Sequence, residues 1–363
     1  MSEIEINNIY ELCSFIDSNS KYDKVSIDLT EISEYGNLKH TLKHLLWKLN
    51  LGGTAELKFA GENKFLHDVH SLSFWQLKFS LINTLANDVR ILGMEDDRVL
   101  IEKCKENYCI NGVSFGIVFS GNKNEEEQLL NSLFSIQSAI FHSDLLNVEV
   151  VVCGPSNYDF NLIKDNLSID VKYLTFDDVY DMESNRFLIS KKKNFLINEL
   201  SYDACVISHT RISFNNDFIS KLNNKKFDIA SPLILDSNTN KPYLGFVLTG
   251  SYDASKLNSK KTITGQMLTS HYFKLMKKRV AYSDGGVIIF NKNNIKHIFN
   301  ENLAWGEGED VDFCAQNYFA GCITDYLKDV ICYSTKNKVN QSKLKNNRVI
   351  NKIRCKLIEF GFF

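Results

Sequence analysis

The chain has 363 residues, of which 44% are hydrophobic and 24% are charged, and its formal net charge is −2. This length is sufficient for two domains with separate cores, and the charge balance excludes the basic signature of a nucleic-acid-binding protein. Nine cysteines are scattered without any Cys-x-x-Cys spacing, which indicates reduced thiols, no structural zinc site and a cytoplasmic location. An acidic N-terminus and the absence of an apolar run of about 20 residues argue against a signal peptide and a membrane span.

Residues 1–108 are predicted to form a small α/β domain. Side-chain periodicity gives, in order, a strand at 24–32, a helix at 38–49, a strand at 54–60, a helix at 73–86 and paired strands at 88–92 and 98–104. We expect Gly52-Gly53 to cap the first helix. His67 and His70 lack a third ligand nearby, so we interpret them as surface or capping residues and not as a metal site.

Residues 109–335 are predicted to form a second α/β domain that begins near Ser114. Its opening is a strand at 114–120, a helix at 125–141 and strands at 148–153 and 171–174, an order typical of a parallel sheet with helices on both faces. Ligands of such sheets bind at the carboxyl ends of the strands. The candidate contacts there are Ser120, Gly121, Asn122, Gly154, Pro155 and Asp177. The alternative is that these residues form ordinary turns.

The rest of this domain contains a lysine run and further strands. Three lysines precede the helix predicted in 190–200, and cations at a helix entry suit a diphosphate, although a solvated basic turn is the alternative. Further expected elements are strands at 204–207, 227–235, 282–290 and 323–334 and a short helix at 291–299.

The stretch 303–312 reads Leu-Ala-Trp-Gly-Glu-Gly-Glu-Asp-Val-Asp and then continues in a helical pattern. Carboxylates at a helix N-terminus are favoured by the helix dipole, so an acidic cap is one interpretation. The other is a general base beside an aromatic wall, because neighbouring like charges raise the pKa of a carboxylate.

Two motifs here resemble GT-A glycosyltransferases of the family 2 and β-1,4-galactosyltransferase kind. Trp305-Gly306 with Gly308-Glu309-Asp310-Val311-Asp312 resembles their Trp-Gly-x-Gly-Glu-Asp-x-Asp signature, and Ser283-Asp284-Gly285-Gly286 followed by an apolar strand resembles their Gly-Gly strand. The resemblance implies that Asp310 deprotonates an acceptor hydroxyl, with inversion at the sugar. It also implies acceptor or sugar contacts by Glu309, Asp284, Gly285, Gly286, Trp305 and Glu307.

The same resemblance bears on the donor site and its metal. It implies that the strand ends hold the nucleotide base and ribose and that Lys193 and Asn194 contact the donor. The strand at 204–207 should end in a metal-binding Asp-x-Asp, yet the sequence continues Ser208-His209-Thr210-Arg211. We therefore assign no metal ligand, although Mn²⁺ or Mg²⁺ is left open. Arg211 and the lysines would then neutralise the diphosphate, and His209 either touches phosphate or is structural.

Residues 20–105 resemble the C-terminal half of a class I SAM-dependent methyltransferase in the order of their elements. The Gly-rich cofactor loop of that family is absent, so we expect a non-catalytic docking or oligomerisation module. The segment 336–363 is basic with helically spaced apolar residues. It is either a helix that lies on an anionic membrane surface or one that packs on the protein.

The resemblance to glycosyltransferases leads to one expected function. A sugar would move from a nucleotide sugar to a glycan or glycolipid acceptor, in surface polysaccharide assembly, without any nucleic-acid partner. The alternative is a non-catalytic glycan-binding or scaffold protein built on a decayed GT-A fold. The oligomeric state is left open.

Overall fold

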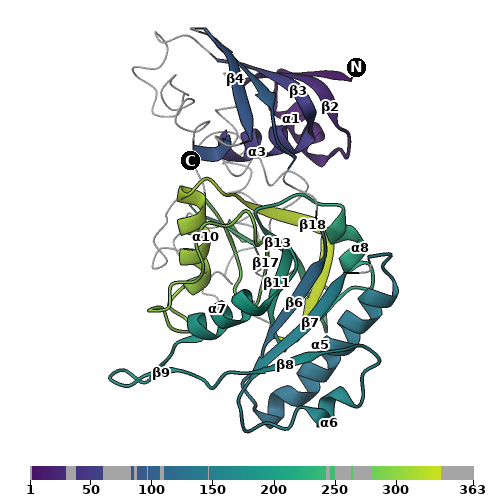
Figure 1. Cartoon of the computed structure of the whole chain (residues 1–363), viewed down its shortest axis with the longest axis vertical. Helices are drawn as coiled ribbons and strands as arrows, with labels where there is room; N and C mark the ends of the chain where they lie inside the picture. Colours follow the sequence, from purple (N-terminus) through teal and green to yellow (C-terminus); the bar gives the residue numbers. More distant parts are fainter. Residues whose placement is uncertain are drawn as a thin grey trace.

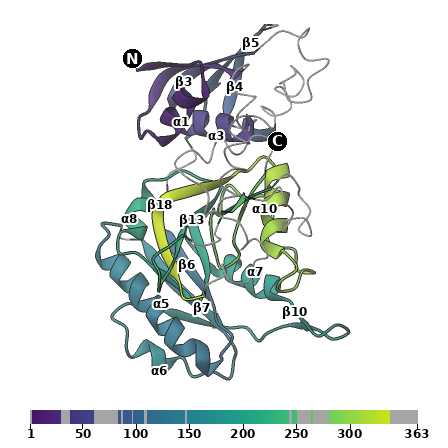
Figure 2. The same ribbon diagram turned by 180° about the vertical axis from the view of Figure 1, so that it is seen from behind.

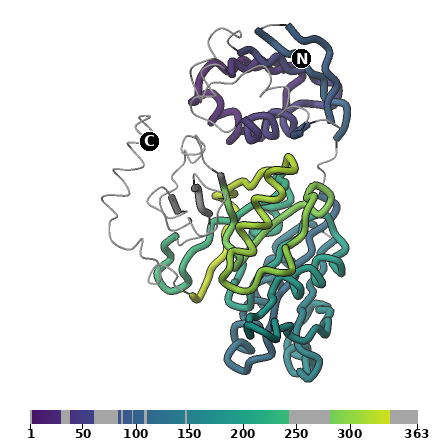
Figure 3. Tube along the Cα trace, turned by 90° about the vertical axis from the view of Figure 1, so that its left-hand side faces the viewer, coloured from purple at the N-terminus to yellow at the C-terminus, as the bar shows by residue number. Residues whose placement is uncertain are grey.

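The computed structural model describes residues 2–29, 38–59, 83–85, 88–95, 97–106, 110–145, 147–242, 246–249, 263–264 and 280–336. It confirms the predicted mixed α/β fold class, with a five-stranded sheet near the N-terminus and an eight-stranded sheet in the remainder of the chain (Figures 1 and 3). The predicted metal-free histidines His67 and His70 and the basic segment after Lys336 lie outside the described residues.

The N-terminal sheet has the strand order β1-β2-β3-β5-β4. Its elements are β1 (Glu3–Ile6), α1 (Ile9–Asp17), β2 (Tyr22–Asp28), α3 (Leu38–Lys48), β3 (Leu49–Lys58), β4 (Val89–Met94) and β5 (Arg98–Lys103). The first three strands run parallel, and β5 runs antiparallel to both of its neighbours. The predicted closing pair of strands is therefore confirmed, whereas β1 and α1 were not predicted.

The expected cap at Gly52-Gly53 is wrong. Helix α3 ends at Lys48, and β3 follows directly, so both glycines lie within the strand. The β2–β3 register shifts at this point, because Tyr22 pairs with Leu49 but Lys24 pairs with Thr54. Gly52 has a φ of +76°, which a residue without a Cβ adopts easily. The helix predicted at 73–86 lies almost wholly outside the described residues.

The second sheet has the order β12-β18-β13-β17-β11-β6-β7-β8. Its strands are β6 (Val113–Val118), β7 (Val148–Gly154), β8 (Lys172–Thr175), β11 (Ala204–His209), β12 (Ile212–Phe214), β13 (Ile229–Asp236), β17 (Val287–Asn291) and β18 (Thr324–Ser334). Strand β17 is antiparallel to β11 and β13, and β12 is antiparallel to β18, while the other strands share one direction. The carboxyl ends of β6, β7 and β11 therefore lie on the same edge of the sheet.

Helices cover both faces of this sheet (Figures 1 and 2). One core joins the sheet to α5 (Lys123–Phe141), α6 (Asn161–Lys164) and α8 (Phe218–Asn223). The other joins it to α7 (Ile189–Glu199) and α10 (Glu309–Phe319). Two smaller strand groups are the hairpin of β9 (Tyr180–Asp181) and β10 (Arg186–Phe187) and the sheet of β14 (Phe246–Thr249), β15 (Ile263–Thr264) and β16 (Val280–Ser283).

The short helix predicted at 291–299 is wrong, because the chain after β17 forms a turn and then has no regular secondary structure. The buried side chain of Asn317 forms hydrogen bonds with backbone groups of this segment. Its Oδ1 accepts hydrogen bonds from the N–H groups of Lys296 and His297, and its Nδ2 donates to the His297 carbonyl. A side chain on α10 thus replaces the hydrogen bonds that a helix would have made within itself.

The N-terminal sheet packs on the second sheet through α3. His40 Nε2 lies 2.9 Å from the Thr324 carbonyl, and Lys43 lies 3.2 Å from the buried Asp228 carboxylate. We call β1–β5 with α1 and α3 the N-terminal unit. Ile323 and Tyr326 belong to the same core cluster as the apolar residues of this unit. The division into two domains near residue 108 stays a prediction. Among the described residues, no helix has both the length and the apolar character that crossing a bilayer requires.

Candidate active site

The acidic stretch, residues 303–312, meets the turn at Gly285-Gly286 at the carboxyl end of β11. We call this turn the Gly-Gly turn. The His209 N–H donates to the Gly286 carbonyl at 3.1 Å, which holds the turn against the strand end. Gly308 forms the N-cap of α10 with a φ of +84°, and Gly306 has a φ of +86°. Glycine suits both positions because a side chain would be strained there. The Gly285 N–H also donates to Asp310, so the two motifs singled out in the sequence lie together.

Asp310 is the carboxylate that faces this turn. Its Oδ2 accepts a hydrogen bond of 2.7 Å from the Gly285 N–H, and the residue stays partly exposed. Desolvation, followed by the charges of Glu309 and Asp284, raises the pKa of Asp310 to about 6. A Cβ at Gly285 would lie only 3.1 Å from Glu309 Oε1 and 3.2 Å from Asp310 Oδ2. The glycine therefore allows both carboxylates to approach the backbone.

Lys193 forms a buried ion pair with Glu309. Its Nζ lies 3.0 Å from Glu309 Oε1 and 4.8 Å from the centre of the Phe299 ring. The lysine run was expected to precede its helix, but it lies inside the first turns of α7, where Lys192 and Lys193 are buried. The alternative of a solvated basic turn is thus wrong for these two residues. Lys193 is directed toward the acidic cluster and not toward solvent.

Asn194 holds the segment that leads into the acidic stretch. Its side-chain amide donates to the Phe299 carbonyl at 2.8 Å and to Glu301 Oε1 at 3.1 Å, and its Oδ1 accepts from the Phe299 N–H at 2.9 Å. The residue is buried and these contacts occupy its amide. We therefore reinterpret the expected donor contact as a structural one.

Arg211 follows β11 and lies against the Gly-Gly turn. A Cβ at Gly286 would be 2.6 Å from Arg211 Nη2 and 2.8 Å from Asp284 Oδ1, and that Asp284 oxygen accepts a hydrogen bond from the Gly286 N–H at 2.9 Å. Within the described part of the chain, the buried Arg211 Nε has no hydrogen-bond partner. An unsatisfied buried donor on a cation is costly, and an anionic ligand would relieve that cost.

Trp305 and Glu307 lie on the loop that precedes α10. Trp305 is 59% exposed, and its ring centre lies 6.3 Å from that of His209. Glu307 accepts hydrogen bonds from the Ala304 N–H at 2.9 Å and from Arg186 at 2.6 Å, which in that order lower the pKa of Glu307. Arg186 was not predicted as a site residue, since a partner 121 positions away in the chain gives no local signal.

A pocket lies at the carboxyl ends of β6 and β7. It has a volume of about 730 Å³ and is lined by Ser120, Gly121, Asn122, Pro155, Ser156, Asn157, Asp177, Asp178 and Tyr180. Five of the six candidates predicted at the strand ends are therefore brought together. Gly154 does not line the pocket, since a Cβ there would lie 2.4 Å from the Tyr173 hydroxyl.

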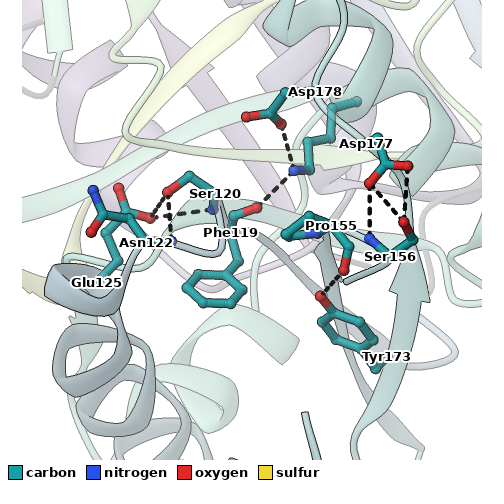
Figure 4. A network of polar contacts seen from close by, with 10 residues as sticks. Phe119, Ser120, Asn122, Glu125, Pro155, Ser156, Tyr173, Asp177 and Asp178 are labelled. Atoms are coloured by element: carbon teal, nitrogen blue, oxygen red, sulfur yellow. Dashed lines mark hydrogen bonds and ion pairs between the residues drawn. The ribbon is translucent and has the colours of Figure 1, made fainter. Parts of the chain in front are cut away.

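Hydrogen bonds fix the walls of this pocket (Figure 4). Asp177 accepts from the Ser156 N–H at 2.9 Å, a bond that lowers the pKa of Asp177. Lys192 donates to the Phe119 carbonyl at 2.7 Å and to Asp178 at 2.8 Å. Lys192 and Asp178 were not among the predicted site residues. A buried lysine beside the pocket could not be inferred from a run of three lysines alone.

The end of β11 supplies few hard oxygen ligands. Ser208, His209 and Thr210 occupy it, and the described residues include no group of three or more His, Cys, Asp or Glu side chains that could hold a metal ion. Hard divalent cations prefer several oxygen ligands. The residues at this strand end therefore do not fit a divalent cation, and Arg211 is the cationic side chain positioned beside it.

Comparisons with known proteins give a distant structural likeness. No protein-family model and no curated protein sequence matches the chain. TarS of S. aureus superposes with a TM-score of 0.40 at 13% identity over 68% of this chain and 42% of its own. A putative glucose-1-phosphate thymidylyltransferase from Bacillus anthracis, in complex with sucrose, superposes with a TM-score of 0.35 at 10% identity over 66% and 95%.

These similarities are too low to assign a family. The chain matches less than half of the length of TarS. Neither structure is described as a methyltransferase, so the resemblance of residues 20–105 to methyltransferases is unsupported by them.

Proposed function

We propose that the chain is a glycosyltransferase that moves a sugar from a nucleotide sugar to a glycan acceptor. The observation that carries this proposal is the Asp310 carboxylate, which is partly exposed and has its pKa raised to about 6 beside the Gly-Gly turn. A base with a pKa near neutrality can both be ionised and accept a proton at physiological pH. A helix cap alone would not require a raised pKa, whereas a general base benefits from one. The pKa of Asp310 therefore favours base catalysis.

The reaction would proceed in one displacement at the anomeric carbon. The acceptor oxygen attacks that carbon as Asp310 takes the hydroxyl proton, and the bond to the nucleoside diphosphate breaks on the opposite side with inversion. The guanidinium of Arg211, which lies by the Gly-Gly turn, would stabilise the negative charge on the leaving diphosphate. The proton on Asp310 then passes to water. No step is assigned to a divalent cation.

The nucleotide would occupy the pocket at the ends of β6 and β7. Strand β6 pairs with β7 on one side and with β11 on the other, so this pocket and Arg211 follow neighbouring strand ends. The backbone groups around Gly121 and the carboxylates of Asp177 and Asp178 offer polar contacts for a base and a ribose. We assign the predicted donor residues Ser120, Asn122 and His209 to the surface that runs from this pocket to Arg211.

The acceptor would lie against the exposed ring of Trp305. Aromatic rings bind the apolar face of a sugar, and Glu307, fixed by Arg186, offers a carboxylate for its hydroxyl groups. The same proposal includes a glycan or glycolipid of a surface polysaccharide as the acceptor. It also includes contact with an anionic membrane surface, a cytoplasmic location and a homo-oligomer.

Calorimetric titration of UDP, GDP, CMP and TDP, with and without Mn²⁺, tests this function. We expect one nucleotide to bind without metal, with at least tenfold weaker binding to Arg211→Met and unchanged binding to the distant control Lys172→Met. Binding of none of the four would refute the donor site and favour a non-catalytic scaffold. Binding only with Mn²⁺ would contradict the assignment of the diphosphate to Arg211.

A further inference from the structure

A second cleft lies between the N-terminal unit and the eight-stranded sheet. Its volume is about 610 Å³, within the range of small-molecule sites. Its walls come from the loop after α1, from α3, from α8 with the residues that follow it, and from the first half of β18. Figure 2 shows the N-terminal unit above the region of β18 and α8.

This cleft is separate from the proposed active site. It includes Asp325–Asp329 near the start of β18, whereas Arg211 and the nucleotide pocket follow the ends of β11, β6 and β7. These strands run in the same direction, and the intervening β17 is antiparallel to β11 and β13. The start of β18 and the end of β11 consequently lie at opposite edges of one sheet.

Lysines outnumber carboxylates among the residues that line the cleft. Its lining contains six lysines, three aspartates and no arginine. The lysines are Lys21, Lys48, Lys221, Lys225, Lys226 and Lys328. Five of them have acidic partners, such as Asp329 for Lys225 at 2.7 Å and Asp17 for Lys328 at 2.9 Å. Partly exposed pairs of this kind are weak and can exchange partners at small cost.

Lys48 differs from the other five. It is largely withdrawn from solvent, and its Nζ donates to the Ser18 carbonyl and lies 3.5 Å from the Ser18 hydroxyl. It forms no ion pair with a carboxylate in the described part of the chain. Burial lowers the pKa of Lys48 to about 8, and the charge of Lys225 contributes to the lowering, while Asp17 and Asp325 oppose it. A cation in this position is stabilised by an added anion.

We propose that this cleft binds a sugar that carries a phosphate group, with Lys48 and Lys225 as the phosphate contacts. Lysine ammonium groups bind phosphate as point charges. The remaining lining includes Asn19, Ser20 and Asn224, whose amides and hydroxyl suit sugar hydroxyls, and the aromatic side chains of Trp47 and Tyr326. The cleft is also much larger than a single phosphate ion requires.

Titration of the full chain with glucose 1-phosphate, inorganic phosphate and glucose tests the proposal. We expect glucose 1-phosphate to bind more tightly than phosphate, and glucose not to bind. Lys48→Met removes the ammonium group, which lies 5.5 Å from the centre of the Phe15 ring, and should weaken binding of glucose 1-phosphate at least tenfold. The matched control Lys172→Met, a lysine on β8 that pairs with Glu199, should leave it unchanged.

The variant Arg211→Met separates this site from the nucleotide pocket. Loss of glucose 1-phosphate binding in Arg211→Met, with retention in Lys48→Met, would overturn the proposal. Equal affinity for phosphate and glucose 1-phosphate would overturn the part that concerns the sugar. Should Lys48→Met fail to fold, as judged by its thermal unfolding, Lys225→Met provides the same measurement from the other wall. These results are independent of whether a nucleotide binds.

Discussion

Lys193 Nζ lies 3.0 Å from Glu309 Oε1, with both side chains buried at the base of the acidic cluster. Glu309 is adjacent to Asp310, and the charge of Lys193 partly offsets the effects that raise the pKa of Asp310. One buried cation therefore balances the Glu309 carboxylate and limits the rise in the pKa of Asp310. The arrangement predicts distinct consequences for stability and for turnover.

Replacing Lys193 by Met should destabilise the fold by about 3–5 kcal/mol, because it leaves the Glu309 carboxylate buried without a partner. Urea unfolding at pH 7 measures the change. The double variant Lys193→Met/Glu309→Gln should recover much of the loss, since a neutral amide replaces the unpaired charge. A single variant as stable as the Lys172→Met control would contradict the pairing.

Replacing Asp310 by Asn should lower turnover by about 10²- to 10⁴-fold, because the amide cannot accept the acceptor proton. Binding of the donor nucleotide should change little, since Asp310 does not line the pocket at the ends of β6 and β7. Single-turnover assays and calorimetry on the same preparation separate the two effects. Wild-type turnover in the variant would disprove the role of Asp310.

The pH dependence of stability should report the raised pKa of Asp310. The folded-state pKa of about 6 exceeds the ordinary value of 3.8, so the native state holds this proton more tightly than the unfolded state does. Ionisation of Asp310 therefore costs stability as the pH rises from about 4 to 6. Asp310→Asn should be more stable than wild type by up to about 3 kcal/mol at pH 7, with no gain below about pH 4. A difference in stability between Asp310→Asn and wild type that is the same at every pH would refute the raised pKa.

Replacing Gly286 by Ala should weaken nucleotide binding without unfolding the protein. The new Cβ would lie 2.6 Å from Arg211 Nη2, so the guanidinium must move. Gly93→Ala is a matched control, because nothing lies within 4 Å of the Cβ position there. We expect a tenfold or greater rise in the dissociation constant for Gly286→Ala alone. Equal affinities for the two variants would show that the position of Arg211 does not matter to the ligand.

From the sequence alone we could predict the α/β class, most strands of the second sheet and the two motifs that meet at the Gly-Gly turn. Strand periodicity is a property of neighbouring residues, and the carboxyl ends of parallel strands meet whatever their loops contain. Thus Ser120 and Asp177 line one pocket, as expected. Glycine was read less reliably, since Gly52 and Gly53 lie in a strand and not at a helix end.

The roles of the charged side chains depend on tertiary contacts that could not be predicted. Lys193 is 116 residues from Glu309, and Arg186 is 121 residues from Glu307, so neither pairing leaves a pattern in the local sequence. The same holds for Asn194, which bonds the segment at Phe299, and for Lys48, whose cleft is formed by two units of the chain. Secondary structure follows local periodicity, whereas the burial and partners of a charge depend on groups that folding brings together from distant positions.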